Sequence, residues 1–472
     1  MKETETKAGV RPFGMRDKLG YMLGDLGNDF TFIFASTYVM VFYSKVMGIS
    51  TEIIGIMFLV ARCFDAFTDI GMGRLVDISK PGKDGKFRCW IRRVCGLVAL
   101  ASFLMYQSFL QGASMQIKII YMFVTYILWG SVFYTAINIP YGSMASALSN
   151  EPEHRSSLSV YRSVGGILAM IIISVVAPLV VYYTDADGNQ VVHSGRLITL
   201  AGVFSVCAVL CYGLCYFMTT ERVKPDKIMP NFEKMPRQSA MKMFKIMFTD
   251  RAFLGMILSA LLMLFANLMG QTLNNYLFAD YFGNAKALSV FSVLALPATL
   301  LLMGIATPVS VKIGKKECGV ACFALAGLTY LLIAFLHITN VWIYIGIAFI
   351  AILGRQCFSM QSYALVTDVI DHLEVKNGNR DDGMVYGVYS FSRKIGQAIA
   401  GYIGGWALAA IGYDSLAVAQ TEAVKEGIYQ VSAIFPAISY LLCALILAFL
   451  YPLNKKTVAE NVAELDSRRK AS

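Results

Sequence analysis

The chain is organised around the stretch Phe58-Leu-Val-Ala-Arg-Cys-Phe-Asp-Ala-Phe-Thr-Asp-Ile-Gly-Met-Gly73, an apolar run that carries Arg62, Asp65 and Asp69. Residues three and four apart share one face of a helix, so with Asp65 at zero, Asp69 falls at roughly +40° and Arg62 at roughly +60°. Thr68 falls at roughly −60°, on the same side. A charge at membrane depth costs roughly 2.5–3.5 kcal/mol on insertion scales. The stretch therefore predicts a membrane helix whose polar stripe faces protein or water and marks a pathway.

The composition of the whole chain also predicts a membrane protein. Of its 472 residues, 57% are hydrophobic and 15% are charged, which excludes an ordinary soluble globule and a disordered chain. The net charge is +10, but the basic residues cluster in loops between apolar runs, as in membrane proteins, so no nucleic-acid partner is expected. Residues 1–17 are polar and mixed in charge, and we interpret them as a retained cytoplasmic tail.

Twelve membrane helices are predicted, because about 20 apolar residues suffice to cross a bilayer. They span residues 18–44, 52–73, 94–112, 117–148, 157–183, 196–219, 251–282, 286–310, 318–337, 340–368, 384–412 and 428–452. The predicted organisation is a tail at 1–17, a six-helix half at 18–219, a cytoplasmic middle linker at 220–250, a second six-helix half at 251–452 and a tail at 453–472.

Basic residues set the predicted orientation. They gather after the second and eighth helices, in the middle linker and in the C-terminal tail, whereas each alternate connection carries at most one. By the positive-inside rule both termini are cytoplasmic, in the inner or plasma membrane. Two parallel six-helix halves joined by a central loop describe the major facilitator architecture, with its solute site near the midplane between the halves. The alternative is twelve unrelated helices.

The first helix carries Asp25, Asn28 and Asp29 with the same i, i+3, i+4 spacing as the second. A carboxylate can accept hydrogen bonds from two neighbouring sugar hydroxyls, so Asp29 is a candidate solute ligand. Asp25 and Asn28 are candidates for a coupling or structural role. The alternative for these carboxylates is an ion pair that locks two helices together.

The stripe on the second helix suits a small cation. Asp65, Asp69 and Thr68 supply hard oxygen ligands for sodium, and Thr135 of the fourth helix could add another. The same carboxylates would carry protons if desolvation raised their pKa. Arg62 would then be a counter-charge that holds the empty site together. A purely structural network is the alternative.

Further cations lie in the predicted membrane helices, namely Arg162, Arg355 and Lys394. If all of them face the cavity, these three cations and Arg62 exceed what Asp29, Asp65 and Asp69 could neutralise, and such a surplus would favour an anionic solute. Asn138, next to a helix-kinking proline, could hydrogen-bond that solute. The alternative for Arg355 is a structural pair with an acid that the sequence does not locate.

Catalytic and metal motifs do not emerge from the chain. Cys207, Cys211 and Cys215 recur at i, i+4 and i+8, a pattern we interpret as small apolar residues on a packed helix, and we expect no structural disulfide. No nucleophile elbow, phosphate loop or zinc signature appears. We therefore expect neither an enzyme nor a cofactor other than a coupling Na⁺ or H⁺.

Several motifs resemble one transporter family in order and spacing over nearly the whole chain. They are Lys18-Leu-Gly-Tyr, Gly24-Asp-Leu-Gly-Asn-Asp29, Ala61-Arg-Cys-Phe-Asp-Ala-Phe-Thr-Asp69, Gly85-Lys-Phe-Arg-Cys-Trp90, Trp129-Gly, Asn138-Ile-Pro-Tyr-Gly142, Asp368-Val-Ile-Asp371 and Phe391-Ser-Arg-Lys-Ile-Gly396. The family is that of the glycoside–pentoside–hexuronide:cation symporters, which are melibiose permease-like members of the major facilitator superfamily.

The resemblance implies roles for individual residues. Asp65, Asp69 and Thr135 match the family's cation ligands, and Thr68 stands where the melibiose carrier has an asparagine. Asp29 and Arg162 match sugar-binding positions, and Lys394 matches a lysine near the cation site.

The chain also departs from the melibiose pattern. Asn28 replaces a lysine, Asn138 a sugar-binding aspartate, Gly142 a tryptophan, and Cys89 the proline of many members. A galactoside substrate is therefore not implied.

The sequence predicts a monomeric symporter that couples import of a glycoside to a Na⁺ or H⁺ gradient. Hexuronides such as glucuronides are among the candidate solutes. The partners of the symporter would be the small-molecule glycoside, a monovalent cation and the lipid bilayer. Two alternatives remain, a transporter or exchanger of a non-sugar organic anion or lysolipid, and a membrane receptor that does not transport.

Overall fold

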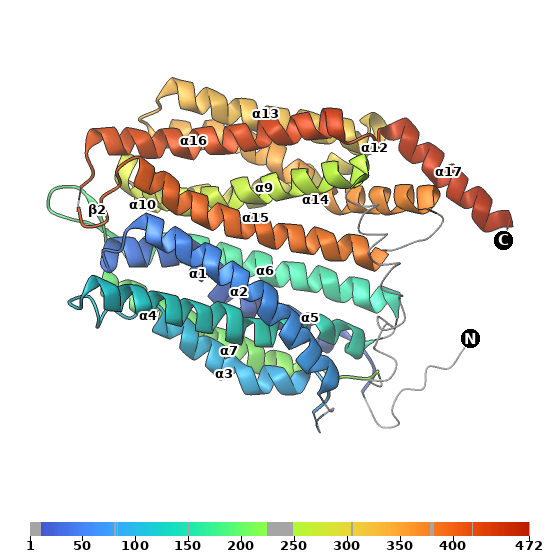
Figure 1. Ribbon diagram of the computed structural model, residues 1–472, viewed down its shortest axis with the longest axis horizontal. Coiled ribbons are helices and arrows are strands. Elements are labelled where there is room, and N and C mark those ends of the chain that lie inside the picture. Colours follow the sequence, from blue (N-terminus) through green and yellow to red (C-terminus); the bar gives the residue numbers. More distant parts are fainter. Residues whose placement is uncertain are drawn as a thin grey trace. The chain divides into compact units, whose positions relative to one another are not determined.

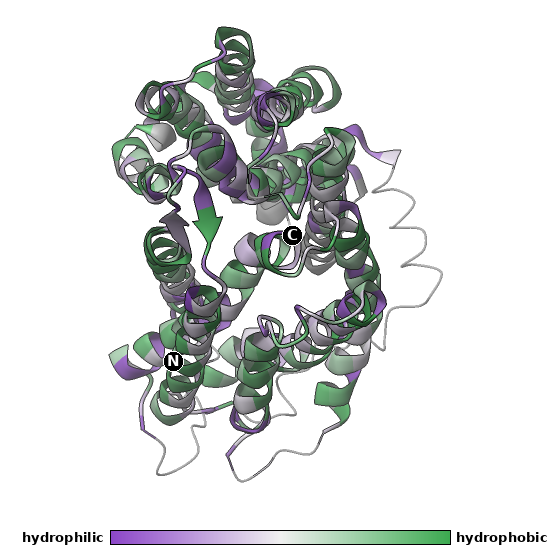
Figure 2. Cartoon of the chain, turned by 90° about the vertical axis from the view of Figure 1, so that its left-hand side faces the viewer, coloured by the Kyte–Doolittle hydropathy of each residue, from purple (hydrophilic) through white to green (hydrophobic). Residues whose placement is uncertain are grey.

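The computed structural model describes residues 11–79, 82, 84–149, 151–223, 249–303, 305–377, 382–417 and 419–471. The predicted middle linker at 220–250 lies largely outside these residues. The chain divides into two compact units: unit 1 comprises Met1–Lys234 with Asp414–Val418, and unit 2 comprises Met235–Tyr413 with Ala419–Ser472. Each unit is a bundle of helices (Figure 1), and hydrophobic colour dominates most helices in Figure 2.

Unit 1 contains seven α-helices, two π-helical segments and a small hairpin among its described residues. Its helical elements are α1 (Met15–Val41), η1 (Phe42–Val46), α2 (Thr51–Ile78), α3 (Arg88–Leu104), α4 (Met115–Ile127), η2 (Leu128–Tyr134), α5 (Thr135–Leu148), α6 (Pro152–Val181) and α7 (Ser194–Met218). Strands β1 (Tyr182–Thr184) and β2 (Gln190–Val192) pair antiparallel, with Tyr182 opposite Val192. The sequence interpretation had no strand here.

All the secondary-structure elements in the described part of unit 2 are helices. Its elements are α9 (Arg251–Tyr276), η5 (Leu277–Tyr281), α10 (Ala285–Val293), α11 (Ala295–Met303), α12 (Ala306–Ile313), α13 (Lys315–Leu336), α14 (Val341–Asn377), α15 (Asp382–Ala410), α16 (Glu422–Leu445), η6 (Ile446–Leu450) and α17 (Lys455–Ala471). Its core lies between α9, α13, α14 and α16, where Phe323 packs against Phe358 with ring centroids 4.1 Å apart.

Within the described residues, seven helices are long and apolar enough to cross a membrane. They are Met115–Leu148, Glu153–Val181, Ser194–Met218, Arg251–Tyr281, Lys315–Leu336, Val341–Lys376 and Glu422–Leu450. Helices α1 and α2 are similar in length, at 27 and 28 residues, and each carries charged residues within its apolar run. The all-α class is confirmed, and the count of twelve membrane helices stays a prediction.

The helices predicted at 286–310 and 94–112 differ from the structure, and α14 continues nine residues beyond the end predicted at 368. The helix predicted at 286–310 is divided into α10, α11 and α12. Pro297 lacks the N–H that would bond the carbonyl of Val293, and α10 ends at Val293. The helix predicted at 94–112 instead runs from Arg88 to Leu104.

The early start of α3 has a long-range cause. The Glu221 carboxylate, which follows α7, accepts hydrogen bonds from the backbone N–H groups of Lys86 at 2.7 Å and of Phe87 and Arg88 at 2.8 Å. A carboxylate at a helix N-terminus satisfies unpaired donors and complements the helix dipole. Gly85 has φ +111°, and a Cβ there would lie 2.6 Å from a Glu221 oxygen. This contact fixes the loop that precedes α3 against the end of α7.

Candidate cation and solute site

Helix α2 presents its acidic stripe to the helix formed by η2 and α5. Asp65 is 9% exposed, and both of its carboxylate oxygens are paired. Oδ1 accepts a hydrogen bond from the Ser131 hydroxyl at 2.6 Å, and Oδ2 accepts one from the Arg62 guanidinium at 2.8 Å. The structure thus places Arg62 as the counter-charge of Asp65, on the same helix.

One turn further along α2, a second carboxylate meets a second hydroxyl. Thr135 donates its hydroxyl hydrogen to Asp69 Oδ1 at 3.2 Å. Thr68 behaves differently, because its hydroxyl donates to the Phe64 carbonyl of its own helix at 3.1 Å. Two carboxylate–hydroxyl pairs therefore lie side by side between α2 and α5, and they form a set of hard oxygen atoms of the kind that Na⁺ binds.

The backbone that carries these hydroxyls is irregular. Ser131 lies within the π-helical segment η2, and Thr135 is the first residue of α5 after it. π-Helical turns inside α-helices occur frequently at functional sites. Pro140 then interrupts the hydrogen-bond ladder of α5. The segment from Leu128 to Pro140 therefore combines the two local distortions with the two hydroxyl groups.

Helices α1 and α6 hold a second polar cluster. Arg162 Nε donates to Asp25 Oδ1 at 2.8 Å, and the Arg162 side chain is 38% exposed while the Asp25 side chain is 10% exposed. The guanidinium carbon of Arg162 lies 5.2 Å from the centroid of the Tyr141 ring. Arg162 and Asp25 therefore form an ion pair that joins α6 to α1.

Asp29 lies beside this pair, against a glycine of α6. A Cβ built on Gly166 would lie 2.8 Å from Asp29 Oδ2 and 3.3 Å from Asp25 Oδ2. Real Cβ atoms do not approach oxygen that closely without a shift, so glycine at this position lets both carboxylates lie against α6. Asp25 and Asp29 thus both lie against Gly166, and Arg162 pairs with Asp25.

Asn28 links the two clusters of unit 1. Its Nδ2 atom donates to Tyr134 Oη at 2.8 Å and to Asn138 Oδ1 at 3.4 Å. Its Oδ1 atom accepts from Tyr212 Oη at 3.2 Å. Asn28 therefore connects α1 to η2, α5 and α7, and Asn138 is placed as its partner.

The candidates in unit 2 are less fully described. Arg355 donates a hydrogen bond to Asn267 Oδ1 at 3.3 Å, so it contacts an amide side chain of α9. The side chain of Lys394 lies outside the described residues.

Four participants were not singled out from the sequence, namely Ser131, Tyr134, Gly166 and Tyr212. Ser131 precedes Thr135 by four residues, so helical spacing from a known candidate could have found it. Tyr212 and Gly166 carried no such signal, because only the packing of α7 and α6 against α1 brings them to the site.

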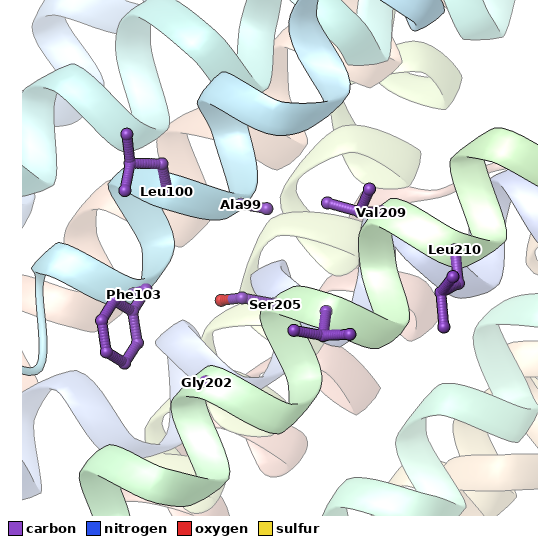
Figure 3. A pocket seen from close by; sticks show the side chains of 8 residues that line it. Ala99, Leu100, Phe103, Gly202, Ser205, Val209 and Leu210 are labelled. Atoms are coloured by element: carbon purple, nitrogen blue, oxygen red, sulfur yellow. The ribbon is translucent and has the colours of Figure 1, made fainter.

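An apolar groove of about 430 Å³ lies apart from these clusters, between α3 and α7 (Figure 3). It is lined by Ala99, Leu100, Phe103, Gly202, Ser205, Val206, Val209 and Leu210. A single hydroxyl, that of Ser205, offers little to orient a polar solute. The groove therefore lacks the groups that a sugar site requires.

Long apolar helices with buried, paired charges are typical of polytopic membrane proteins that move ions or solutes. The chain matches the family described as MFS/sugar transport protein over residues 20–455. It therefore belongs to this family of the major facilitator superfamily, and the predicted fold class is confirmed.

Curated relatives cover almost the whole chain. The "Uncharacterized symporter YjmB" of Bacillus subtilis (strain 168) is 30% identical and covers 96% of each chain. The "Glucuronide carrier protein homolog" of Escherichia coli (strain K12) is 28% identical and also covers 96% of each. The "Putative sulfoquinovose importer" of Salmonella typhimurium is 29% identical and covers 97% of this chain and 93% of that protein.

Solved structures support the same fold. A D-xylose–proton symporter has a TM-score of 0.61 and 15% identity, and covers 93% of this chain and 98% of its own. A bacterial homologue of the human lysosomal transporter Spinster, inward-facing and unoccupied, has a TM-score of 0.65 and 12% identity, and covers 96% and 99%. At these identities the likeness shows the fold alone.

Proposed function

We propose that this protein is a cation-coupled symporter that imports an anionic glycoside across the inner membrane, with both termini in the cytoplasm. The observation that carries the proposal is the double pairing of Asp65 with Ser131 and of Asp69 with Thr135. Two carboxylates with two hydroxyls supply at least four oxygen atoms within one bundle. A transporter that needed no cation would gain little from two acidic residues at membrane depth.

The hydroxyl groups explain how such a site would work with and without the ion. In the structure each hydroxyl lies within hydrogen-bond distance of a carboxylate oxygen, at 2.6 Å for Ser131 and 3.2 Å for Thr135. A hydroxyl can rotate and offer a lone pair instead, so Na⁺ would take the place of the two hydrogens. If the coupling ion is a proton, one of the two carboxylates would carry it.

The solute end of the proposal rests on Asp29 and Arg162. Asp29 would accept hydrogen bonds from sugar hydroxyls, and Arg162 would bind a negative group on the same sugar. Arg162 is held by Asp25, so an anionic solute would share the guanidinium with that carboxylate. Relatives named for glucuronide and for sulfoquinovose point to the same solute class, since both compounds carry an anionic group on a sugar ring.

Coupling between the two ligands would follow from differential affinity. Asn28 connects α1, which carries the proposed solute ligand, to η2 and α5, which carry the proposed cation ligands. If cation and solute favour the same conformation, each raises the affinity for the other by the same factor. Alternating access would then carry both in the same direction.

A second candidate function is transport of a small organic anion without a sugar ring. A relative in Escherichia coli (strain K12), the "Putative 2,3-dihydroxypropane-1-sulfonate exporter", is 28% identical and covers 99% of each chain. Its named compound has two hydroxyls and a sulfonate, which Asp29 and Arg162 would bind in the same manner.

Uptake by proteoliposomes separates the two candidates. The panel contains a radiolabelled glucuronide, the matching neutral glucoside and 2,3-dihydroxypropane-1-sulfonate, each tested with an inward Na⁺ gradient, an inward proton gradient and no gradient. The proposal predicts that one cation gradient drives accumulation of the glucuronide above that of the glucoside. Accumulation of the sulfonate alone would establish the second candidate.

A further inference from the structure

Three cysteine thiols meet in unit 2, far along the chain from the acidic stripe of α2. Cys318 and Cys322 lie one turn apart on α13, and Cys357 lies on α14. Their three sulfur atoms all lie within 4.8 Å of one another, and those of Cys318 and Cys322 are 4.0 Å apart. Cys318 and Cys357 are 4% and 7% exposed, and Cys322 is half-buried. The helical spacing of the two cysteines on α13 and the packing of α14 against α13 bring the three sulfur atoms together.

A buried amide is directed at the same sulfur atoms. Gln361 lies one turn beyond Cys357 on α14 and is 5% exposed. Its Nε2 atom lies 3.3 Å from the sulfur of Cys318 and 3.5 Å from that of Cys357, and it also donates to the Cys357 carbonyl at 3.4 Å. Its Oε1 atom is buried without a hydrogen-bond partner among the described residues. N–H groups directed at sulfur stabilise thiolates, and the amide oxygen is left available beside them.

The spacing of the sulfur atoms fits a three-coordinate soft cation. With a metal–sulfur bond of about 2.3 Å, a planar arrangement of three ligands separates the sulfur atoms by about 4 Å. Thiolates select soft cations such as Cu(I) over Na⁺ and Mg²⁺, which prefer oxygen. Zn²⁺ almost always takes four ligands in structural sites, whereas the cluster offers three thiols.

We propose that Cys318, Cys322 and Cys357 form a binding site for a soft monovalent cation of the Cu(I) type, supported by the Gln361 amide. Each thiol would lose its proton to the buffer as its sulfur–metal bond forms, so binding releases up to three protons. The apolar side chains of Leu302 and Val309 pack against the cluster. This site is separate from the proposed coupling site, since the two draw on different units of the chain.

The chain carries its own control for this proposal. Cys207, Cys211 and Cys215 also follow helical spacing, but all three lie on the single helix α7. Their first and last members are eight residues apart, so at 1.5 Å per residue their backbones are separated by about 12 Å. One small ion cannot bind all three. Replacement of these cysteines tests whether any cluster of thiols would give the same result.

The test uses the full chain, purified with its thiols reduced, and Cu(I) supplied in competition with a colorimetric Cu(I) chelator. The wild-type protein is expected to take one Cu(I) per chain, with three sulfur ligands at about 2.3 Å by X-ray absorption. The triple variant Cys318→Ser, Cys322→Ser, Cys357→Ser should lose this binding, and the triple variant Cys207→Ala, Cys211→Ala, Cys215→Ala should keep it. Gln361→Leu should weaken it by about 10–100-fold, as loss of a supporting group does in other metal sites.

The metal-free thermal unfolding of each variant is measured alongside, to establish that it is folded. Equal affinity of the wild-type protein and of a folded Cys318/Cys322/Cys357 serine variant would overturn the proposal. A disulfide between two of these three cysteines in the protein purified under the same reducing conditions would also overturn the proposal, because two of the three thiols could then no longer bind the ion.

Discussion

The Ser131 hydroxyl lies 2.6 Å from Asp65 Oδ1 and joins η2 to the acidic stripe of α2. The other oxygen of the same carboxylate is held by Arg62 at 2.8 Å. Asp65 is thus fixed from two sides, one of them neutral and able to rotate. Under the proposed function, a cation could take the place of the hydroxyl hydrogen while Arg62 keeps the carboxylate in position.

Replacement of the hydroxyls should weaken cation binding before it affects the fold. Ser131→Ala or Thr135→Ala removes one oxygen from the proposed set, so we expect the Na⁺ concentration or acidity needed for half-maximal uptake to rise by about tenfold, the equivalent of about 1.4 kcal/mol. The measurement is initial uptake rate against cation concentration. Ser146→Ala is the matched control, since Ser146 also lies on α5 and its hydroxyl donates to the Ser143 carbonyl of the same helix at 2.7 Å. An equal effect of Ser146→Ala would remove the site-specific explanation.

Gly166→Ala should disturb the solute cluster. The new methyl group would lie 2.8 Å from Asp29 Oδ2, so the carboxylate or α6 must shift, at a cost of about 1–3 kcal/mol. We expect solute affinity to fall by about 10–100-fold, with a smaller change in cation affinity. Gly213→Ala on α7 is the control, because a Cβ there meets no atom within 4 Å. Tight solute binding by Gly166→Ala would show that Asp29 and Asp25 do not need this close approach.

Glu221→Gln should destabilise unit 1 without touching the proposed binding clusters. The carboxylate accepts three backbone N–H hydrogen bonds at the start of α3. The amide keeps one acceptor oxygen and turns a donor towards N–H groups, so a loss of about 2 kcal/mol is expected. Thermal unfolding in detergent measures it. Glu153→Gln, at the exposed first turn of α6, should leave the unfolding temperature unchanged, and a comparable loss there would contradict the role given to Glu221.

Asp250 should make stability depend on acid. It caps α9 by accepting from the N–H of Ala252 at 2.9 Å, and it pairs with Lys376 at 2.8 Å and His372 at 3.5 Å. Burial raises the pKa of Asp250, but the hydrogen bonds from His372 and Lys376 outweigh it and hold the pKa well below its ordinary value. The unfolded chain then binds this proton more readily than the folded one.

The stabilisation from Asp250 is therefore complete above the ordinary aspartate pKa of about 3.9 and is lost as pH falls below it. Asp250→Asn keeps an acceptor for the cap but loses the ion pair with Lys376, so it should lower stability at neutral pH by about 1 kcal/mol. It should also flatten the acid dependence of the unfolding temperature. A variant that keeps the full acid dependence would show that other carboxylates cause it.

The positions of most helices could be predicted from apolar runs alone, since a membrane helix needs little more than length and hydrophobicity. The start of α3 could not, because its cap comes from Glu221, more than a hundred residues away in the chain. The break after Val293 was missed for a different reason. Pro297 lies within an otherwise apolar run, and its missing N–H outweighed the hydropathy pattern.

The candidate site shows the same division. Helical spacing placed Asp65, Asp69 and Arg62 on one stripe, because that is a property of a single helix. It could not show that Arg162 pairs with Asp25, since pairing depends on which faces of α1 and α6 meet. The thiol cluster of unit 2 was missed likewise: spacing relates Cys318 to Cys322, but only the packing of α13 on α14 adds Cys357.

Accumulation of a radiolabelled glucuronide in proteoliposomes, by the wild-type protein and by Asp65→Asn with Asp69→Asn, tests the central claim most directly. The wild-type protein should concentrate the solute when an inward Na⁺ or proton gradient is imposed, and should stop when the gradient is dissipated. The double variant should still bind and exchange the glucuronide through Asp29 and Arg162, but it should not concentrate it. Gradient-driven accumulation by the double variant, equal to that of the wild-type protein, would contradict the assignment of the coupling site to α2.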